Sequence, residues 1–328
     1  MAVVPLEARI DATRMRQLLS AAIPDSPLAF TRRINVEADR AMLVDQLTQA
    51  LPADADLRFV HEAGGADVAV FARTLAWDSA FFGYGVARLE GIFSLTPGAT
   101  PVDYRSAVTA LVELAAARDV TYLFAVVDAR DLATLRALGD AGFALIETRL
   151  YYHRDLEHYA HDHRYAARVA TPADVPLLAA AARDTVNAYD RFHADPHITR
   201  AQADDMMCRW VEASVLEGFA DVTFVPDEPQ PKAFCTARYH KDKWERWGLR
   251  LAQPVFSAVA PEFKGWYRKL ISEITYHLIE QGAQHAFMTT QATNSAVVWA
   301  WESLGYRYGK AEHILRKITR GSERERRA

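Results

Sequence analysis

The stretch Ala286–Tyr306, AFMTTQATNSAVVWAWESLGY, organises the C-terminal half of this 328-residue chain. It opens with Ala286–Thr290, an apolar run of the length of a buried strand. Asn294 then offers a side-chain oxygen that can cap a helix, and Gly305 stands where a left-handed C-cap belongs. Between these two lie apolar residues at helical spacing: Val297, Val298, Trp301 and Leu304. The stretch therefore predicts a buried strand followed by an amphipathic helix.

Two more elements are expected just upstream. Tyr267–Gln281 carries an apolar face at helical spacing, formed by Leu270, Ile271, Ile274 and Leu278. Pro254–Ala260, PVFSAVA, has the composition of a strand. The order strand, loop, helix, strand, helix predicts a βαβα unit whose first loop lies in Pro261–Tyr267.

These residues resemble a known family. A Thr-Gln pair, Asn294 three residues after the Gln, an aromatic residue seven positions later and a Gly-aromatic pair at the end are similar to the GNAT superfamily of acyl-CoA-dependent N-acyltransferases. The pattern more closely resembles the dTDP-fucosamine acetyltransferase branch, which acts on nucleotide-linked amino sugars. Leu75–Gly83, LAWDSAFFG, is similar to the W-D/E-x-x-F-F-G signature of that branch. Asp190–Ala194, DRFHA, falls near the family's acceptor-side helix.

Composition sets limits on the class of protein. The net charge of −4 gives no reason to expect nucleic acid as a partner. Cys208 and Cys235 are too few for a disulfide framework, and no apolar run is long enough for a signal core or a membrane span. We therefore expect a cytoplasmic protein without a membrane partner. Thr319–Ala328 is a basic tail of the kind that is usually solvated and disordered.

The chain contains an internal repeat. A shift of 163 positions places Gly142 on Gly305 and Phe143 on Tyr306, and it aligns the apolar positions of the helix Asp103–Arg118 with those of Tyr267–Gln281. The expected fold is α/β or α+β, with two GNAT-like domains that each contain a mixed, mostly antiparallel sheet flanked by helices. We predict a degenerate domain at residues 1–155, a linker at 156–166, the acyltransferase domain at 167–318 and the tail at 319–328.

Other elements are expected along the chain. Helices are predicted at Glu7–Ala22, Ala38–Leu51, Asp131–Asp140, Val175–Asn187 and Arg200–Glu217. Strands are predicted at Val68–Arg73, Ala87–Phe93, Thr121–Val127, Phe143–His153, Val222–Val225 and Lys232–His240.

The resemblance implies a pyrophosphate-binding loop at Glu262–Tyr267, which matches the family's Q/R-x-x-G-x-G/A run. One glycine is kept, Glu262 replaces Gln or Arg, and Tyr267 replaces a small residue. The implied cofactor-binding residues are Lys264, Gly265, Trp266, Tyr267, Arg268 and Lys269. Two interpretations stay open: an eroded loop with solvated cations, or a modified pyrophosphate site in which the Tyr267 hydroxyl donates to a phosphate. The equivalent loop near Val102–Tyr104 has no glycine, so no cofactor is expected there.

The resemblance also implies a thioester contact from the backbone of Ser257, Ala258 and Val259, and it places Asn294 beside the cofactor. Trp301 occupies the position where many relatives carry a tyrosine that protonates the departing thiolate. An indole N–H donates a hydrogen bond but is no proton source near neutral pH. Trp301 is therefore expected either in the core or as a wall of the pantetheine channel.

The acceptor amine needs a group that receives its proton, and His193 and Asp190 in DRFHA are the candidates, with His240 behind them. Acceptor binding is assigned to Arg191 and Gln291 and to four residues of the WDSAFFG signature: Trp77, Asp78, Phe81 and Phe82. For the two phenylalanines, a role in the core of the N-terminal domain is the alternative. The histidines His153, His158, His161 and His163 fit no familiar metal-site spacing, so no metal is expected.

The resemblance thus implies transfer of an acyl group from acyl-CoA to the amine of a nucleotide-linked amino sugar by direct attack. The partners would be these two small molecules, and a homodimer is left open. Two alternatives remain. One is an acyltransferase of the same fold that uses a carrier-protein thioester or another thioester, and the other is a catalytically inactive GNAT-like binding protein.

Overall fold

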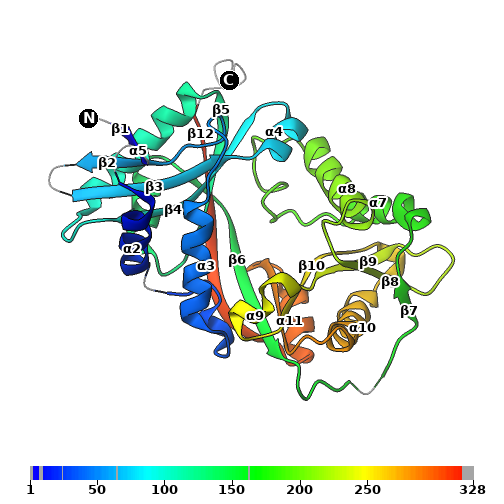
Figure 1. Cartoon of the computed structure of the whole chain (residues 1–328). Helices are drawn as coiled ribbons and strands as arrows, with labels where there is room; N and C mark the ends of the chain where they lie inside the picture. The colour runs from blue at the N-terminus through cyan, green and yellow to red at the C-terminus, as the bar shows by residue number, and fades with distance from the viewer. Residues whose placement is uncertain (1–2, 7–9, 24, 64–65, 162, 320–328) are drawn as a thin grey trace. The chain divides into compact units, whose positions relative to one another are not determined.

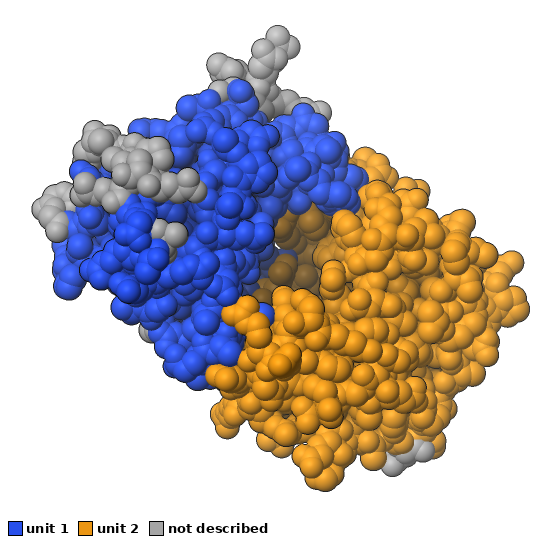
Figure 2. All heavy atoms as spheres, in the orientation of Figure 1, with its two compact units in different colours: residues 1–27, 36–148, 311–328 blue, residues 28–35, 149–310 orange. Residues whose placement is uncertain are grey.

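The computed structural model describes residues 3–6, 10–23, 25–63, 66–161 and 163–319. The chain forms two compact units (Figure 2). Unit 1 comprises Met1–Pro27, Val36–Thr148 and Ala311–Ala328, and unit 2 comprises Leu28–Asn35 and Arg149–Lys310. The units therefore differ from a simple division in chain order, because a short early segment belongs to unit 2 and the C-terminal segment belongs to unit 1. The predicted tail beyond Thr319 lies outside the described residues.

Unit 1 combines a mixed sheet with flanking helices (Figure 1). Its strands follow the order β1-β2-β3-β4-β5-β12 across the sheet. The elements are β1 (Val3–Pro5), α2 (Ala12–Ala22), α3 (Val36–Thr48), β2 (Phe59–Ala63), β3 (Ala66–Thr74), α4 (Ala76–Phe82), β4 (Gly85–Ser94), α5 (Pro101–Ala117), β5 (Val120–Asp128), α6 (Leu132–Asp140), and parts of β6 (Ala144–Asp155) and β12 (Arg307–Ile318).

Two apolar clusters hold unit 1 together. In one, the buried face of α5, including Ala107, Val108 and Leu111, packs against residues of β2 to β5. In the other, Met15 and Leu19 of α2 pack with residues of α3 and of β2 and β3. Both faces of this sheet are thus covered by helices whose apolar spacing is visible in the sequence.

Unit 2 has the strand order β6-β11-β10-β9-β8-β7. Its elements are the 3₁₀ turn η1 (Ala29–Thr31), β7 (Ala167–Val169), η2 (Pro172–Asp174), α7 (Val175–Asp184), α8 (Arg200–Leu216), β8 (Val222–Pro226), β9 (Ala233–Arg238), η3 (Lys241–Lys243), α9 (Trp244–Trp247), β10 (Leu251–Val259), η4 (Pro261–Phe263), α10 (Trp266–Glu280), β11 (His285–Gln291) and α11 (Ser295–Ser303), with parts of β6 and β12. Leu270, Ile271, Ile274 and Leu278 of α10 are buried against the sheet in one cluster with Trp301 and Leu304.

The predicted fold class is confirmed. The pairs β4–β5 and β10–β11 are parallel. The pairs β1–β2, β2–β3, β3–β4, β5–β12, β6–β11, β7–β8, β8–β9 and β9–β10 are antiparallel. No helix of the described residues is long and apolar enough to cross a membrane.

The internal repeat is present in the local geometry as well. Asp131 caps α6 and Asn294 caps α11, and each accepts a hydrogen bond from the backbone three residues later. Gly142 and Gly305, which follow these two helices, have φ of +77° and +76°. The same shift of 163 positions relates both pairs, so the repeat extends to the helix caps.

Some expected elements differ from those observed. The WDSAFFG signature forms the short helix α4, which Gly83 ends with φ of +73°. The helix expected at Glu7–Ala22 begins at Ala12 among the described residues, because Asp11 caps it by accepting from the Arg14 backbone, and residues 7–9 lie outside the description. The helix expected to reach Asn187 ends at Asp184.

A close backbone approach at the start of β4 yields a test of the fold. A Cβ added at Gly85 would lie 2.3 Å from the Asp119 carbonyl oxygen, where β4 meets β5. Gly85→Ala should therefore lower the free energy of unfolding by about 1–3 kcal/mol, measured by urea denaturation. Gly139→Ala is the matched control, because a Cβ there meets nothing within 4 Å and the residue lies in α6. The control should stabilise by about 0.5–1 kcal/mol, and equal loss in both variants would contradict the packing argument.

Candidate functional site

The strands β10 and β11 diverge within unit 2. They pair in parallel at two positions, Leu251 with His285 and Ala252 with Ala286. Both strands continue beyond this point, β10 to Val259 and β11 to Gln291. On its other side, β10 stays paired with β9 as far as Val259. The edge of β10 that faces β11 therefore carries backbone groups outside the ladder, which need other partners.

A β-bulge marks the divergent part of β10. The register with β9 shifts between Pro254 and Ser257. Within the bulge, the Phe256 backbone N–H donates to Thr236 Oγ1 at 3.0 Å. Ser257, Ala258 and Val259 follow the bulge in the segment that has left β11. Their contact with a thioester stays a prediction. The backbone groups that would make this contact lie on the edge of β10 that is no longer paired with β11.

The N-terminus of α10 lies next along the chain and has no side-chain cap. Gly265 is its N-cap residue with φ of +96°, a conformation that favours glycine. The first backbone N–H groups of this helix point out of its N-terminus, where the helix dipole favours a negative charge. The turn is exposed at Lys264 and Gly265. These features suit binding of an anionic group.

The equivalent helix of unit 1, α5, differs at this point. Thr100 and Asp103 form a capping box, in which the Thr100 backbone N–H donates to Asp103 Oδ2 at 2.7 Å. This bond and that from the Thr100 side chain hold the pKa of Asp103 below its usual value. Pro101 also removes one N–H from the first turn. A carboxylate of the chain itself thus lies at the N-terminus of α5, where it would repel an anion.

The charges around the α10 turn are partly compensated. Glu262 accepts a hydrogen bond from Lys232 Nζ at 2.7 Å, and this pairing holds the pKa of Glu262 below its usual value. The charge of this acidic residue, which stands where the family has Gln or Arg, is thereby partly offset. Lys269 Nζ lies 4.8 Å from the Trp266 ring centroid. Within the described part of the chain, Arg268 Nε is buried without a hydrogen-bond partner.

The interpretation of the Tyr267 hydroxyl as a phosphate donor needs correction. This hydroxyl accepts a hydrogen bond from Trp301 Nε1 at 2.8 Å, and burial raises its pKa well above the usual value. The ring is partly buried and packs against the apolar core of unit 2. The hydroxyl is therefore directed into the core and away from the exposed turn at Gly265.

Trp301 takes the first of its two expected roles. Its side chain is 3% exposed and belongs to the core of unit 2. The ring lies 5.6 Å from that of Tyr152, whose hydroxyl donates to Glu302 Oε1 at 2.9 Å. Burial, together with the bond to Glu302, raises the pKa of Tyr152 to about 12. Sequence reasoning did not find the pairing of Trp301 with Tyr267, because the two residues lie 34 positions apart.

His193 lies between two carboxylates. Its Nδ1 is 2.6 Å from Asp190 Oδ2 and its Nε2 is 3.0 Å from Asp204 Oδ1, with the side chain 4% exposed. These bonds, that to Asp190 foremost, raise the pKa of His193. A general base needs a free nitrogen lone pair, and this ring has both nitrogens engaged. The geometry favours a structural ion network over the expected base role of His193 and Asp190.

The acceptor-side segment does approach the motif strand. Asn187 Nδ2 donates to Gln291 Oε1 at 2.6 Å, which ties the segment after α7 to the end of β11. Asn294 sits three residues later as the cap of α11. Arg191 lies over the Phe192 ring at 4.6 Å, within the same segment. No local pattern singles out Asn187, because its partner is 104 residues away.

The WDSAFFG residues lie in unit 1, on and next to α4. Trp77 and Phe81 stack with ring centroids 5.9 Å apart, and Phe82 is 8% exposed. Phe82 therefore fits the core alternative, whereas Trp77, Asp78 and Phe81 are partly exposed. Their role in acceptor binding stays a prediction.

The structure also places the remaining histidine candidate, His240. His240 Nε2 lies 3.3 Å from Gln253 Oε1, and burial lowers the pKa of this imidazole. Among the described residues, no three His, Cys, Asp or Glu side chains gather as a group that could hold a metal ion.

Comparisons with known proteins give the class of fold. A GCN5-related N-acetyltransferase from Sphaerobacter thermophilus aligns over 98% of this chain and 96% of its own, with a TM-score of 0.60 and 13% identity. A tandem GNAT protein from the clavulanic acid biosynthesis pathway aligns over 98% of this chain and 99% of its own, with a TM-score of 0.54 and 15% identity. No protein-family model and no curated protein sequence matches the chain.

A third solved structure covers one part of a larger protein. It is a GCN5-related glucosamine N-acetyltransferase region of a fungal multi-domain β-N-acetylglucosaminidase, and it aligns over 80% of this chain and 33% of its own, with a TM-score of 0.52 and 13% identity. At these identities the likeness establishes the fold. The chain has the fold of the GCN5-related N-acetyltransferases in its tandem form.

The His193 network should show a defined pH dependence. A raised pKa means that the stability from His193 is fully present below about pH 6.5 and is lost as pH rises through the raised value. Burial alone would raise the pKa of Asp204, but His193 and Arg200 hold it below its usual value, so its contribution is lost as pH falls below about 4. His193→Gln should therefore cost about 3 kcal/mol of unfolding free energy near pH 5.5 and less near pH 9. Urea denaturation at both pH values measures this, with the exposed His163→Gln as control. A loss that is constant with pH would contradict the ionic network.

The pairing of Trp301 with Tyr267 can be measured by a double-mutant cycle. Trp301→Phe leaves the buried Tyr267 hydroxyl without its donor and should lower the unfolding free energy by about 1–3 kcal/mol. Tyr267→Phe removes the other partner, so the double variant should lose less than the sum of the single losses. Trp299→Phe, on the same helix and 67% exposed, should change stability by less than about 0.5 kcal/mol. Strict additivity in the cycle would argue against the hydrogen bond.

Proposed function

We propose that this protein is an acyl-CoA-dependent N-acyltransferase whose thioester site lies in unit 2. The observation that carries the proposal is the divergence of β10 from β11 directly before the uncapped N-terminus of α10. The divergent edge offers backbone groups to an extended amide-containing chain, as pantetheine is. The helix N-terminus offers N–H groups to the pyrophosphate at the other end of the same molecule. Both features lie on consecutive parts of the chain.

The proposed reaction is a direct transfer. The neutral amine attacks the thioester carbonyl, so that a C–N bond forms and the C–S bond breaks. A backbone N–H of Ser257, Ala258 or Val259 donates to the carbonyl oxygen as negative charge develops on it, a contribution of about 2.7–4 kcal/mol for a well-placed donor. The electron pair of the broken bond leaves on sulfur as the CoA thiolate.

The positions of Trp301 and His193 bear on how protons move in the proposed reaction. Trp301 is a core residue and supplies no proton. A thiol has a pKa near 8.5, so the thiolate is a fair leaving group without a dedicated acid. His193 has both ring nitrogens engaged, so we propose that water receives the amine proton. Asn187 and Gln291 are the polar side chains that we propose to orient this water or the acceptor.

For the acceptor we propose the amine of a nucleotide-linked amino sugar. The LAWDSAFFG signature supports this class through its resemblance to the dTDP-fucosamine acetyltransferase branch. One structural neighbour is itself described as a glucosamine N-acetyltransferase region. Partly exposed Trp77 and Phe81, stacked on each other in unit 1, offer aromatic surface for a base or sugar ring.

We also propose that residues 1–155 are a degenerate half without an acyl-CoA site and that residues 167–318 carry catalysis. The contrast between the two helix N-termini supports this division. In α5 the carboxylate of Asp103 occupies the N-terminus, whereas in α10 the N-terminus has no side-chain cap and begins with an exposed glycine. An anionic ligand would be repelled at the first position and attracted at the second.

Binding of CoA tests the proposal. CoA at about 100 times its dissociation constant should add about 2.7 kcal/mol to the stability of the protein. The double variant Lys264→Gln, Lys269→Gln removes two cations from the α10 turn and should raise the dissociation constant of CoA at least about tenfold in calorimetric titration. Arg105→Gln, which the repeat aligns with Arg268, is the matched control in unit 1 and should leave the constant unchanged within about twofold.

Turnover gives the second measurement. Release of free thiol from acetyl-CoA should depend on an added nucleotide-linked amino sugar and should be weak with glucosamine alone. No CoA binding, or weakened binding in Arg105→Gln with none in the lysine variant, would refute the acyl-CoA site in unit 2. CoA binding without transfer to any amino sugar would refute the acceptor class and leave the donor site standing.

A further inference from the structure

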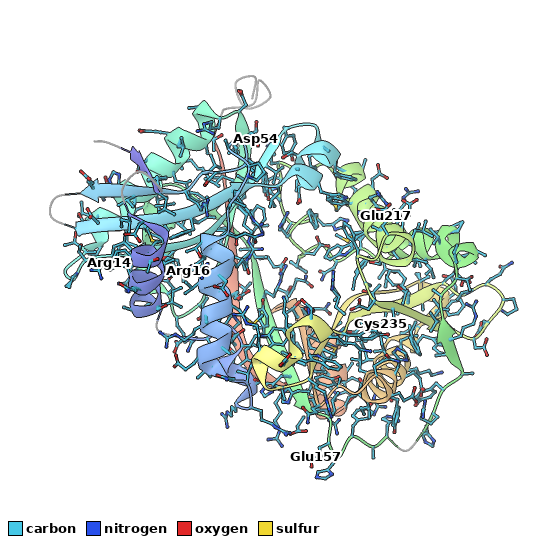
Figure 3. All side chains as sticks on the ribbon, viewed as in Figure 1. Arg14, Arg16, Asp54, Glu157, Glu217 and Cys235 are labelled. Carbon is cyan, nitrogen blue, oxygen red and sulfur yellow. The ribbon has the colours of Figure 1, made fainter. Side chains whose placement is uncertain are left out.

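Unit 2 contains a polar pocket that the proposed acyl-transfer site does not use. It has a volume of about 500 Å³ and lies where β6 ends and β11 begins. Its lining comes entirely from unit 2: Thr31, Arg33, His153, Arg154, Asp155, Glu157, His158, His285, Gly305 and Arg307. Glu157, on the loop that follows β6, is labelled in Figure 3. Six of these ten residues are arginines or histidines.

The charges of this pocket are unevenly paired. Arg33 forms ion pairs with Asp155 and with Glu157, the latter at 3.8 Å, so both carboxylates of the lining share one arginine. Within the described part of the chain, neither Arg154 nor Arg307 forms an ion pair. Three arginines against two carboxylates leave the lining with an excess of positive charge. An anion would supply the missing partner for the two unpaired guanidinium groups.

Two neighbouring residues hold the Arg154 side chain in place. Its guanidinium lies 4.5 Å from the centroid of the Tyr159 ring. A Cβ on Gly305 would lie 2.8 Å from Arg154 Nη1, so the guanidinium occupies the space that this glycine leaves. Stacking on an aromatic ring holds an arginine while its N–H groups stay available to a ligand. The glycine that ends the α11 turn therefore has a second structural role at this pocket.

Two of the histidines, His153 and His285, add hydrogen-bonding groups that are neutral. His153 Nδ1 and His285 Nε2 lie 2.9 Å apart, and the two rings stack. Burial lowers the pKa of both imidazoles, that of His285 to about 4. His285 is 2% exposed, and among the described residues its Nδ1 has no hydrogen-bond partner. One residue of the lining thus carries a buried polar atom that the protein itself leaves unsatisfied.

This pocket is remote from the proposed thioester site. His285 begins β11 and Gln291 ends it, so the two ends lie about 20 Å apart at about 3.3 Å per residue. The proposed site uses the Gln291 end, and the pocket lies at the His285 end. A neighbouring pocket of about 320 Å³ shares Arg33 and Glu157 and adds Arg250 together with the apolar residues Leu156, Ile279 and Ala283. The two pockets together can hold a charged group and a less polar part of one small molecule.

We propose that this pocket, named here the arginine–histidine pocket, binds the phosphate or pyrophosphate group of a small molecule. Arg154 and Arg307 donate to the phosphate oxygens, and Arg33 remains paired with Asp155 and Glu157. The inference does not depend on the proposed acyltransferase function, because the two sites share no residue.

Calorimetric titration with inorganic pyrophosphate at low ionic strength tests the proposal on the full chain. The protein background is Lys264→Gln, Lys269→Gln, so that binding at the α10 turn does not interfere. Pyrophosphate should bind this background. Adding Arg154→Gln and Arg307→Gln should weaken binding at least about tenfold. Arg183→Gln, which removes the arginine of an exposed ion pair between α7 and α8, is the control for loss of a surface arginine and should leave binding within about twofold.

A comparison of two anions tests whether the pocket prefers phosphate to carboxylate. Malonate, a dicarboxylate of similar size, should bind at least about tenfold more weakly than pyrophosphate, since it offers fewer acceptor oxygens to the same donors. Equal affinity for the two anions would overturn the assignment to phosphate. Binding that survives the Arg154 and Arg307 changes would overturn the site itself. So would a dissociation constant for pyrophosphate weaker than about 1 mM.

The variants need a check of folding. Arg154 stacks on Tyr159, so the double arginine variant is accepted only if its far-UV circular dichroism and thermal midpoint match those of the background. Arg307→Gln alone, at an exposed position on β12, gives the same readout where the double variant is unstable. In the background protein, pyrophosphate should also shift the ring NMR signals of His153 and His285 and leave that of His193 in place. Signals of His153 and His285 that do not move during saturation would contradict the proposal.

Discussion

The early divergence of two parallel strands is the constraint on which unit 2 depends. β10 and β11 share two residue pairs and then separate, and β10 remains bonded to β9 along its length. A separation of this kind leaves backbone N–H and C=O groups unpaired, which is unfavourable unless a ligand or other groups take their place. Helices α10 and α11 meet on the covered face of these strands, where Trp301 and Tyr267 join them through one hydrogen bond. The bulge in β10 adds to the departure from a regular ladder.

Unit 1 repeats this arrangement with a different outcome. Its parallel pair β4–β5 continues from Gly85 to Leu89 before the strands part, and β4 also has a register shift against β3. The N-caps that the repeat relates are alike, because Asp131 caps α6 and Asn294 caps α11. The helix N-termini differ, because α5 is capped by its own carboxylate and α10 is not. One geometry is thus present twice, and the electrostatics at the helix N-terminus favours an anion in one copy.

Departures from the family pattern in unit 2 are compensated locally. Glu262 is paired with Lys232, so its charge is offset next to the turn. The bulky Tyr267 is accommodated by turning its ring into the core, where Trp301 donates to its hydroxyl. The two large residues that replace a small residue and a tyrosine in the family pattern are therefore partners of each other. Both ring nitrogens of His193 are bound to carboxylates. This arrangement favours structural stability over proton transfer.

The sequence by itself determined the fold class and the main elements around the candidate site, but it did not predict the strands β1, β2, β7 and β12. Apolar spacing placed α10 and β11 to within about two residues, and Asn294 and Gly305 marked the ends of α11, because caps and periodicity are local properties of a few neighbouring residues. The repeat of 163 positions was likewise visible in the apolar pattern. The tertiary structure alone decided the membership of Leu28–Asn35 in unit 2, the hydrogen bond of Trp301 to Tyr267, the contact of Asn187 with Gln291 and the gathering of Arg154 with His285. These are contacts between residues far apart in the chain, and side-chain pairing across such separations is fixed by strand register and packing, which no local pattern records.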